Sequence, residues 1–137
     1  MEVATLLSYW LNVLLNKLKA LVSLVLITLS TPVYSHEMTP TYPVFVQSFM
    51  AGISVTTMNL FNKRADVAYY EIGVFDSKWE PISFVSQYTV IPMKYLDTVA
   101  FDVYVSNLSL ARVEYICSVS QVQDGATVAS KICSRVK

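Results

Sequence analysis

The two cysteines are the residues whose types and spacing point most directly to a defined chemistry. Cys117 and Cys133 are separated by a segment that contains Asp-Gly-Ala at 124–126, a sequence typical of a tight β-hairpin turn. Counting six residues outward on each side of this loop, from Gln123 and from Thr127, reaches both cysteines. Directly opposed residues on neighbouring antiparallel strands lie near disulfide reach. We therefore expect a disulfide, which is typical of an oxidising compartment.

The remaining chemistry-bearing residues do not form a recognisable catalytic or metal-binding set. Two cysteines and the single histidine, His36, do not complete a zinc shell. His36 lies in a predicted arm, away from any nucleophile, and no C-x-x-C motif is present. The carboxylate pairs are close in sequence only and are typical of turns or solvated strand faces: Asp76 with Glu80, and Asp97 with Asp102. We expect no cofactor, no metal and no enzymatic activity, and a small secreted hydrolase-like enzyme is the least favoured reading.

The charge balance argues against nucleic acid as a partner. The chain has 10 basic and 10 acidic residues, so its formal net charge is zero. Proteins that bind nucleic acids present a basic face to the phosphates. The sequence predicts no nucleic-acid binding.

The cysteines are positioned by a series of short strands. Between Thr98 and Ser106 apolar and polar residues alternate, as a half-buried strand requires, with Val99, Phe101, Val103 and Val105 on one face. Further strands are predicted at 53–61, 67–76, 82–85, 88–91, 112–119 and 127–136. The apolar faces of three of them are predicted to be Tyr70, Ile72 and Val74; Val113, Tyr115, Cys117 and Val119; and Val128, Ile132 and Val136.

This pattern predicts an all-β fold, an immunoglobulin-like antiparallel β-sandwich of about seven strands over residues 53–137. A small β-barrel is the alternative. No helical period is found after residue 35.

The N-terminal segment predicts export. Lys17 and Lys19 precede an uncharged, mostly apolar run at 20–29, and Pro32 follows it. We predict that residues 1–35 form a signal peptide, cut after Ser35. The alternative is an uncleaved anchor over residues 3–29, which would have to bury both lysines. Residues 36–52 are predicted to form an extended arm. The protein is then periplasmic or extracellular, and it meets a membrane only if the N-terminal segment is retained.

A family resemblance extends this interpretation. Asn59-Leu60-Phe61-Asn62-Lys63, followed by Val67 to Asp76, Tyr88 to Pro92 and Val99 to Val105, resembles the N-terminal immunoglobulin-like domain of PapD-like periplasmic pilus chaperones. The similarity spans about residues 45–136 and concerns the order of strands. Members of that family have a second domain, which this chain lacks, so we expect a distant single-domain relative.

The resemblance implies a binding mode. In that family the final strand of the first domain lends alternating apolar side chains to a subunit, and a basic pair anchors the subunit's carboxylate. Val128, Ile132 and Val136 would match the donor strand. Lys131 and Arg135 lie beside them, although neither matches the family's anchoring positions.

The leading prediction is a secreted or periplasmic, non-enzymatic protein-binding module. It would act through strand addition at this terminal edge strand or through aromatic residues on a sheet face. An edge covered by the arm at 36–52 would exclude the first mode. The alternative is a structural component of an extracellular or virion assembly, in which exposed aromatic residues form the contacts. The candidates are Tyr69, Trp79, Tyr88, Tyr95 and Tyr104.

Overall fold

The computed structural model describes residues 2–28, 35–121 and 128–137, and the chain forms two compact units. The first unit, Met1–Val33, contains helix α1 (Glu2–Thr28), and the second, Tyr34–Lys137, contains the strands found among the described residues. In the described part of the chain, no helix has both the length and the apolarity that crossing a membrane requires.

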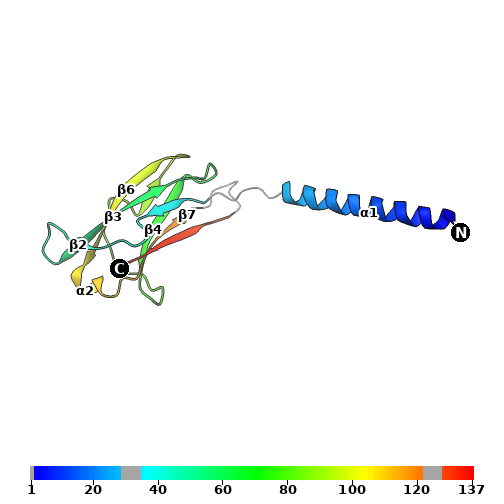
Figure 1. Cartoon of the computed structure of the whole chain (residues 1–137). Coiled ribbons are helices and arrows are strands. Elements are labelled where there is room, and N and C mark those ends of the chain that lie inside the picture. Colours follow the sequence, from blue (N-terminus) through cyan, green and yellow to red (C-terminus); the bar gives the residue numbers. More distant parts are fainter. Residues whose placement is uncertain (1, 29–34, 122–127) are drawn as a thin grey trace. The chain divides into compact units, whose positions relative to one another are not determined.

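The second unit consists of two antiparallel sheets packed face to face (Figure 1). In the first sheet the central strand is β3 (Ile53–Phe61), which pairs along its whole length with β6 (Thr98–Ser106). The other edge of β3 is shared by two short strands, β1 (Glu37–Thr39) and β2 (Val46–Gln47). The predicted all-β sandwich is therefore confirmed.

The second sheet carries the disulfide hairpin. Its strand order is β5-β4-β7-β8, and its members are β5 (Val90–Pro92), β4 (Tyr69–Phe75), β7 (Tyr115–Ser120) and β8 (Lys131–Arg135). Strands β7 and β8 pair in the register Cys117 opposite Cys133. The predicted turn at Asp124-Gly125 lies outside the described residues.

The core lies between the sheets and is filled by alternate residues of each strand. Strand β6 buries Phe101, Val103 and Val105, with Val99 packed at its margin. Strand β4 buries the three residues predicted for its inner face, Tyr70, Ile72 and Val74. The period-two pattern thus identified the inner faces of β4 and β6 correctly.

The prediction for the inner face of β7 is wrong. Ile116, Ser118 and Ser120 point into the sandwich, whereas Tyr115 lies on the outer face with the disulfide. The sequence pattern favoured the odd-numbered residues because they are more apolar. Serines can face a core when buried partners satisfy their hydroxyl groups. Here His36 bonds to Ser118 from 82 positions away, and Ser130 bonds to Ser120 across the hairpin.

Three further segments differ from the prediction. Residues 82–85 form no strand; they cross between the sheets, bonding to β4 at Ile82 and to β6 at Val85. The strand predicted at 88–91 is β5, which begins two residues later. A one-turn helix, α2 (Asn107–Leu110), follows β6 because the Ser106 hydroxyl caps it by accepting from the Leu108 N–H.

The segment predicted as an arm is part of the sandwich. It contributes β1 and β2 to the first sheet, with a cis Thr39–Pro40 peptide after β1. The Thr41 and Pro43 carbonyls then accept from the N–H groups of Arg135 and Lys137. The segment therefore links the first sheet to the edge strand of the second.

Candidate binding surface

The outer face of β4, β7 and β8 holds the disulfide at its centre. Cys117 and Cys133 are bonded, with an S–S distance of 2.07 Å, and their Cα atoms are 4.0 Å apart. So close an approach is typical of a non-hydrogen-bonded pair in an antiparallel ladder. The bond therefore braces the two strands that carry most of this face.

A glycine on β4 makes room for an aromatic ring beside the disulfide. Gly73 is the register partner of Cys117, and the ring of Phe75 lies over it. A Cβ atom at position 73 would come within 2.7 Å of that ring. Glycine inside a strand often marks a close approach of this kind.

Three aromatic rings and one lysine form a cluster on this face, which we call the aromatic–lysine cluster: Phe75, Trp79, Tyr115 and Lys131. The Trp79 and Tyr115 rings are stacked, with centroids 4.5 Å apart and planes 4° from parallel. The Lys131 Nζ atom lies 4.5 Å from the Phe75 centroid and 4.6 Å from that of Trp79. Cation–π attraction therefore holds the ammonium against both rings.

The turn after β4 sets the position of Trp79. One carboxylate oxygen of Asp76 accepts from the N–H groups of Lys78 and Glu80, at 2.9 and 3.0 Å. Both bonds lower the pKa of the Asp76 carboxyl below its usual value, and the bond from the Glu80 N–H has the larger effect. Trp79 takes a left-handed backbone conformation (φ 66°), which turns its half-exposed ring toward Tyr115.

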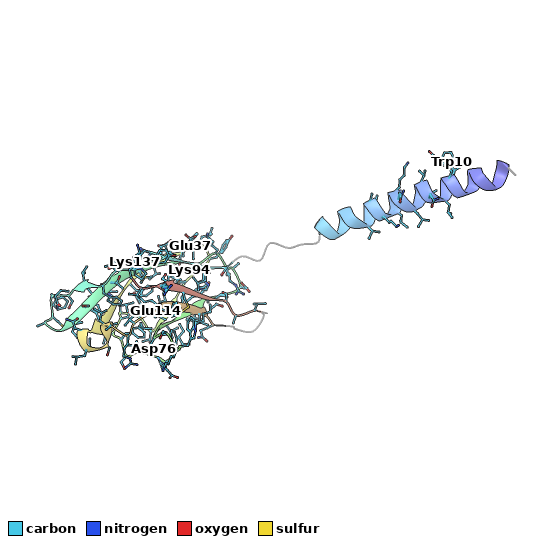
Figure 2. All side chains as sticks on the ribbon, turned by 60° about the horizontal axis from the view of Figure 1, so that its bottom comes forward. Trp10, Glu37, Asp76, Lys94, Glu114 and Lys137 are labelled. Atoms are coloured by element: carbon cyan, nitrogen blue, oxygen red, sulfur yellow. A yellow bond between two sulfur atoms is a disulfide. The ribbon has the colours of Figure 1, made fainter. Side chains whose placement is uncertain are left out.

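Two ion pairs flank the cluster. Arg135 and Glu114 are 2.8 Å apart, and Arg112 and Asp76 are 3.5 Å apart. Figure 2 labels Asp76 and Glu114, whose segments are joined because the Glu114 N–H donates to the Phe75 carbonyl. Both arginine side chains are exposed, so these pairs contribute little to stability.

The predicted edge-strand residues fall on opposite sides of β8. Ile132 and Val136 are packed against the core, and Val128 precedes the strand and is exposed. Lys131 joins the aromatic–lysine cluster, and Arg135 pairs with Glu114. The apolar and basic residues therefore do not form one surface.

The outer edge of β8 is half covered. The Ser130 carbonyl and the Val136 N–H both bond toward β7. Because backbone groups alternate in direction along a strand, those of the odd-numbered residues between them point away from β7. At Arg135 and Lys137 these groups bond to the 41–43 segment. At Lys131 and Cys133, no backbone partner on that edge lies among the described residues.

A second polar site is buried at the other end of these strands. His36, only 3% exposed, places its Nε2 atom 2.7 Å from the Ser118 hydroxyl and its Nδ1 atom 3.1 Å from that of Ser130. Burial lowers the pKa of His36, the charge of Arg64 lowers it further, and the Ser118 carbonyl acts in the opposite direction. The lowered pKa favours the neutral form of His36 at pH 7.

This site is not arranged for catalysis. Ser118 is fully buried, so its hydroxyl cannot meet a substrate, and Nδ1 of His36 faces a serine rather than a carboxylate. Arg64 pairs with Asp66 and donates to the Val128 carbonyl at 2.7 Å. His36 and Arg64 instead connect the first segments of the sandwich to the β7–β8 hairpin by hydrogen bonds.

Asn62 organises the same end of the domain. Its amide donates to the carbonyls of Val67 and Lys94, at 3.0 and 3.1 Å. Its oxygen accepts from the Arg64 N–H at 2.9 Å and from the Tyr70 hydroxyl at 2.6 Å. A fully buried side chain thus satisfies four polar groups.

Sequence reasoning proposed Trp79 as a contact residue but missed Phe75, Tyr115 and His36. Gly73, two residues before an aromatic residue in an apolar strand, is the available signal for Phe75. The place of His36 depends on residues more than eighty positions away and leaves no local signal.

Comparisons with known proteins bear on the fold alone. No protein-family model matches the chain, and no curated protein matches it. The crystal structure of the periplasmic chaperone SfaE is similar to it, with a TM-score of 0.51 and 8% sequence identity. The match covers 75% of this chain and 56% of that one, so the chain spans a little over half of the chaperone's length. This is a distant structural relationship, in agreement with the family resemblance at the level of fold.

Proposed function

We propose that the protein is an exported, non-enzymatic protein-binding module that captures its partner on the aromatic–lysine cluster. The observation that carries this proposal is the Trp79–Tyr115 stack, held by Lys131 on the outer face of a disulfide-braced sheet. Tryptophan and tyrosine are enriched among the residues that dominate binding energy at protein interfaces. The rings are already ordered, so little side-chain entropy is lost when a partner covers them.

Export is supported by the disulfide, which persists in oxidising compartments. It is also supported by the apolar N-terminal segment, which we propose to be a signal peptide or an anchor. The structural similarity to a periplasmic chaperone agrees with this assignment.

Site-specific photocross-linking in the exporting host tests the proposal. A benzoylphenylalanine at Trp79 should give a discrete cross-linked product with a partner protein. The same group at Asn59, on the exposed outer face of β3, is the control and should give none. If neither position yields a product, or both yield the same one, the cluster is not the binding surface.

A second binding mode, strand addition to β8, is favoured by the outward backbone groups of Lys131 and Cys133. A partner strand could pair there alongside the 41–43 segment. Lys131→Pro removes the outward N–H without touching the ladder to β7. Lys131→Ala keeps that N–H and removes only the ammonium.

The two variants separate the binding modes. Loss of the partner in both variants supports the aromatic–lysine cluster. Loss in Lys131→Pro alone, with the disulfide intact, supports strand addition. Ile132→Lys cannot serve this purpose, because Ile132 packs against the protein's own core.

A further inference from the structure

An apolar tip of three side chains projects from two loops at one end of the sandwich. Phe49 is 87% exposed, Met50 44% and Leu108 94%. The first two lie in the β2–β3 loop, and Leu108 lies in α2. Figure 1 shows β2 and α2 at the same end of the domain, and the Asn107 N–H donates to the Gly52 carbonyl at 2.9 Å.

The tip contains no charged residue. No Asp, Glu, Lys, Arg or His occurs between Glu37 and Lys63, or between Asp102 and Arg112. Both loops can therefore move from water into an apolar environment without the cost of desolvating a charge. Arg112, the first charged residue after α2, has an exposed side chain.

Hydrogen bonds within the tip satisfy much of its backbone. The Gln47 amide lies 2.9 Å from the Met50 carbonyl and 3.0 Å from that of Ile53. The Met50 N–H donates to the Ser48 hydroxyl at 3.1 Å. The Leu108 N–H donates to the Ser106 hydroxyl at 3.3 Å. Internal pairing of this kind is what a backbone needs in lipid, where no water is available.

The absence of charge in the tip favours lipid, and its size is sufficient for shallow insertion. A buried aromatic side chain covers roughly 150–250 Å², and Met and Leu cover less. Three such side chains alone supply less than the roughly 800 Å² per partner that a standard-sized protein interface buries. Shallow insertion into a bilayer has no such minimum area, because each apolar side chain contributes separately.

From these observations we propose that the tip inserts into the surface of a lipid bilayer. Phe49, Met50 and Leu108 enter the apolar layer, and Arg112 stays at the level of the headgroup phosphates. The inference is independent of the protein-binding function proposed above. It adds a membrane contact that the sequence alone led us to expect only at the N-terminal segment.

Local fluorescence on the full chain tests this inference. The native cysteines are paired, so a single introduced cysteine can carry the environment-sensitive dye NBD. With the dye at Leu108→Cys, vesicles of phosphatidylcholine with phosphatidylglycerol should shift its emission to the blue. The dye at Asn59→Cys should not respond. Binding of α1 to the vesicles cannot mimic this result, because the dye reports only on its own surroundings.

A second variant tests the role of Phe49. Phe49→Ser in the chain labelled at position 108 should raise the lipid concentration for half of the shift about tenfold or more. Phe49 is exposed, so its replacement leaves the core intact. A shift with phosphatidylcholine alone also supports insertion, and shows that it needs no anionic lipid. If the dye at position 108 remains in an aqueous environment with both kinds of vesicle, the inference is wrong.

Discussion

At the scale of single residues, the domain depends on polar side chains that are buried and fully paired. Among the described residues, every buried side-chain nitrogen or oxygen atom has a hydrogen-bond partner. His36, Asn62 and Arg64 account for many of these bonds at one end of the sandwich. Removing one partner of such a group costs more than the bond itself, because the other is left unsatisfied in a dry interior.

Asn62→Ala is therefore expected to destabilise the domain strongly. It leaves the carbonyls of Val67 and Lys94, the Arg64 N–H and the Tyr70 hydroxyl without their partner. We expect the free energy of unfolding to fall by about 3 kcal/mol or more. Asn59→Ala, at an exposed position of the preceding strand β3, is the control and should change it by less than about 0.5 kcal/mol. Urea unfolding measures both, and equal losses would contradict this account of Asn62.

The stability of the domain should also fall in mild acid because of His36. Its pKa is lowered in the folded state, so the unfolded chain binds a proton first as the pH falls. The contribution of neutral His36 is complete above the ordinary value of 6.5 and is lost as the pH falls through the folded-state pKa. The slope from this one group is at most about 1.4 kcal/mol per pH unit.

Urea unfolding between neutral pH and pH 5 measures this dependence. His36→Gln keeps a polar side chain but cannot titrate, so its stability should vary less over the same range. If the wild type and the variant lose stability in parallel, another group is responsible.

At the scale of elements, the β7–β8 hairpin combines a covalent brace with an exposed aromatic face. The disulfide closes a loop with a sequence separation of 16. The same strands position Tyr115 and Lys131, so bracing the hairpin also orders the aromatic–lysine cluster.

Replacing both cysteines by alanine should remove about 3 kcal/mol of stability, from the entropy of a loop of this length. The native disulfide protein in a strong reductant should show a similar loss. The stacked rings should also become less ordered, which near-ultraviolet circular dichroism would report. An unchanged unfolding midpoint would show that the bond does not constrain the unfolded chain.

The same hairpin shows what sequence patterns can and cannot predict. Its register was predictable, because the counting from an Asp-Gly turn involves only neighbouring residues. The inner face of β7 was not, because Ser118 and Ser120 are placed by His36 and Ser130. The burial of Ile132 and Val136 was also missed, since alternation identifies an apolar face but not whether the chain itself or a partner covers it.

At the scale of the whole molecule, the question is whether the exposed aromatic residues serve a partner or another copy of the chain. A monomeric binder should keep a constant mass by light scattering over a wide range of protein concentrations. A structural component of an assembly should gain mass as concentration rises. If the aromatic–lysine cluster forms the contact between copies, Trp79→Ala should suppress that gain in mass. This result would show that the protein is a structural component of an assembly rather than a monomeric binding module.

The fold as a whole was the most predictable level. Strands β4 and β6 follow from alternation and β3 from its β-branched and aromatic residues, and the two-sheet arrangement follows from the number and spacing of the strands. The short strands β1 and β2 were read as an arm, because each owes its structure to pairing with β3 rather than to its own sequence. The apolar tip was not predictable from the sequence either, since its two loops are brought together only by the fold.

The pairing of residues 41–43 with β8 has a consequence for how the domain forms during synthesis. The first segment of the sandwich finds its hydrogen-bond partners in the last, and His36 and Ser130 are 94 positions apart. Contacts over such separations form slowly, since a long loop must close before they are made. The nascent chain therefore cannot complete the sandwich until its final strand has emerged. Until then the Thr41 and Pro43 carbonyls lack the partners that Arg135 and Lys137 provide in the folded domain.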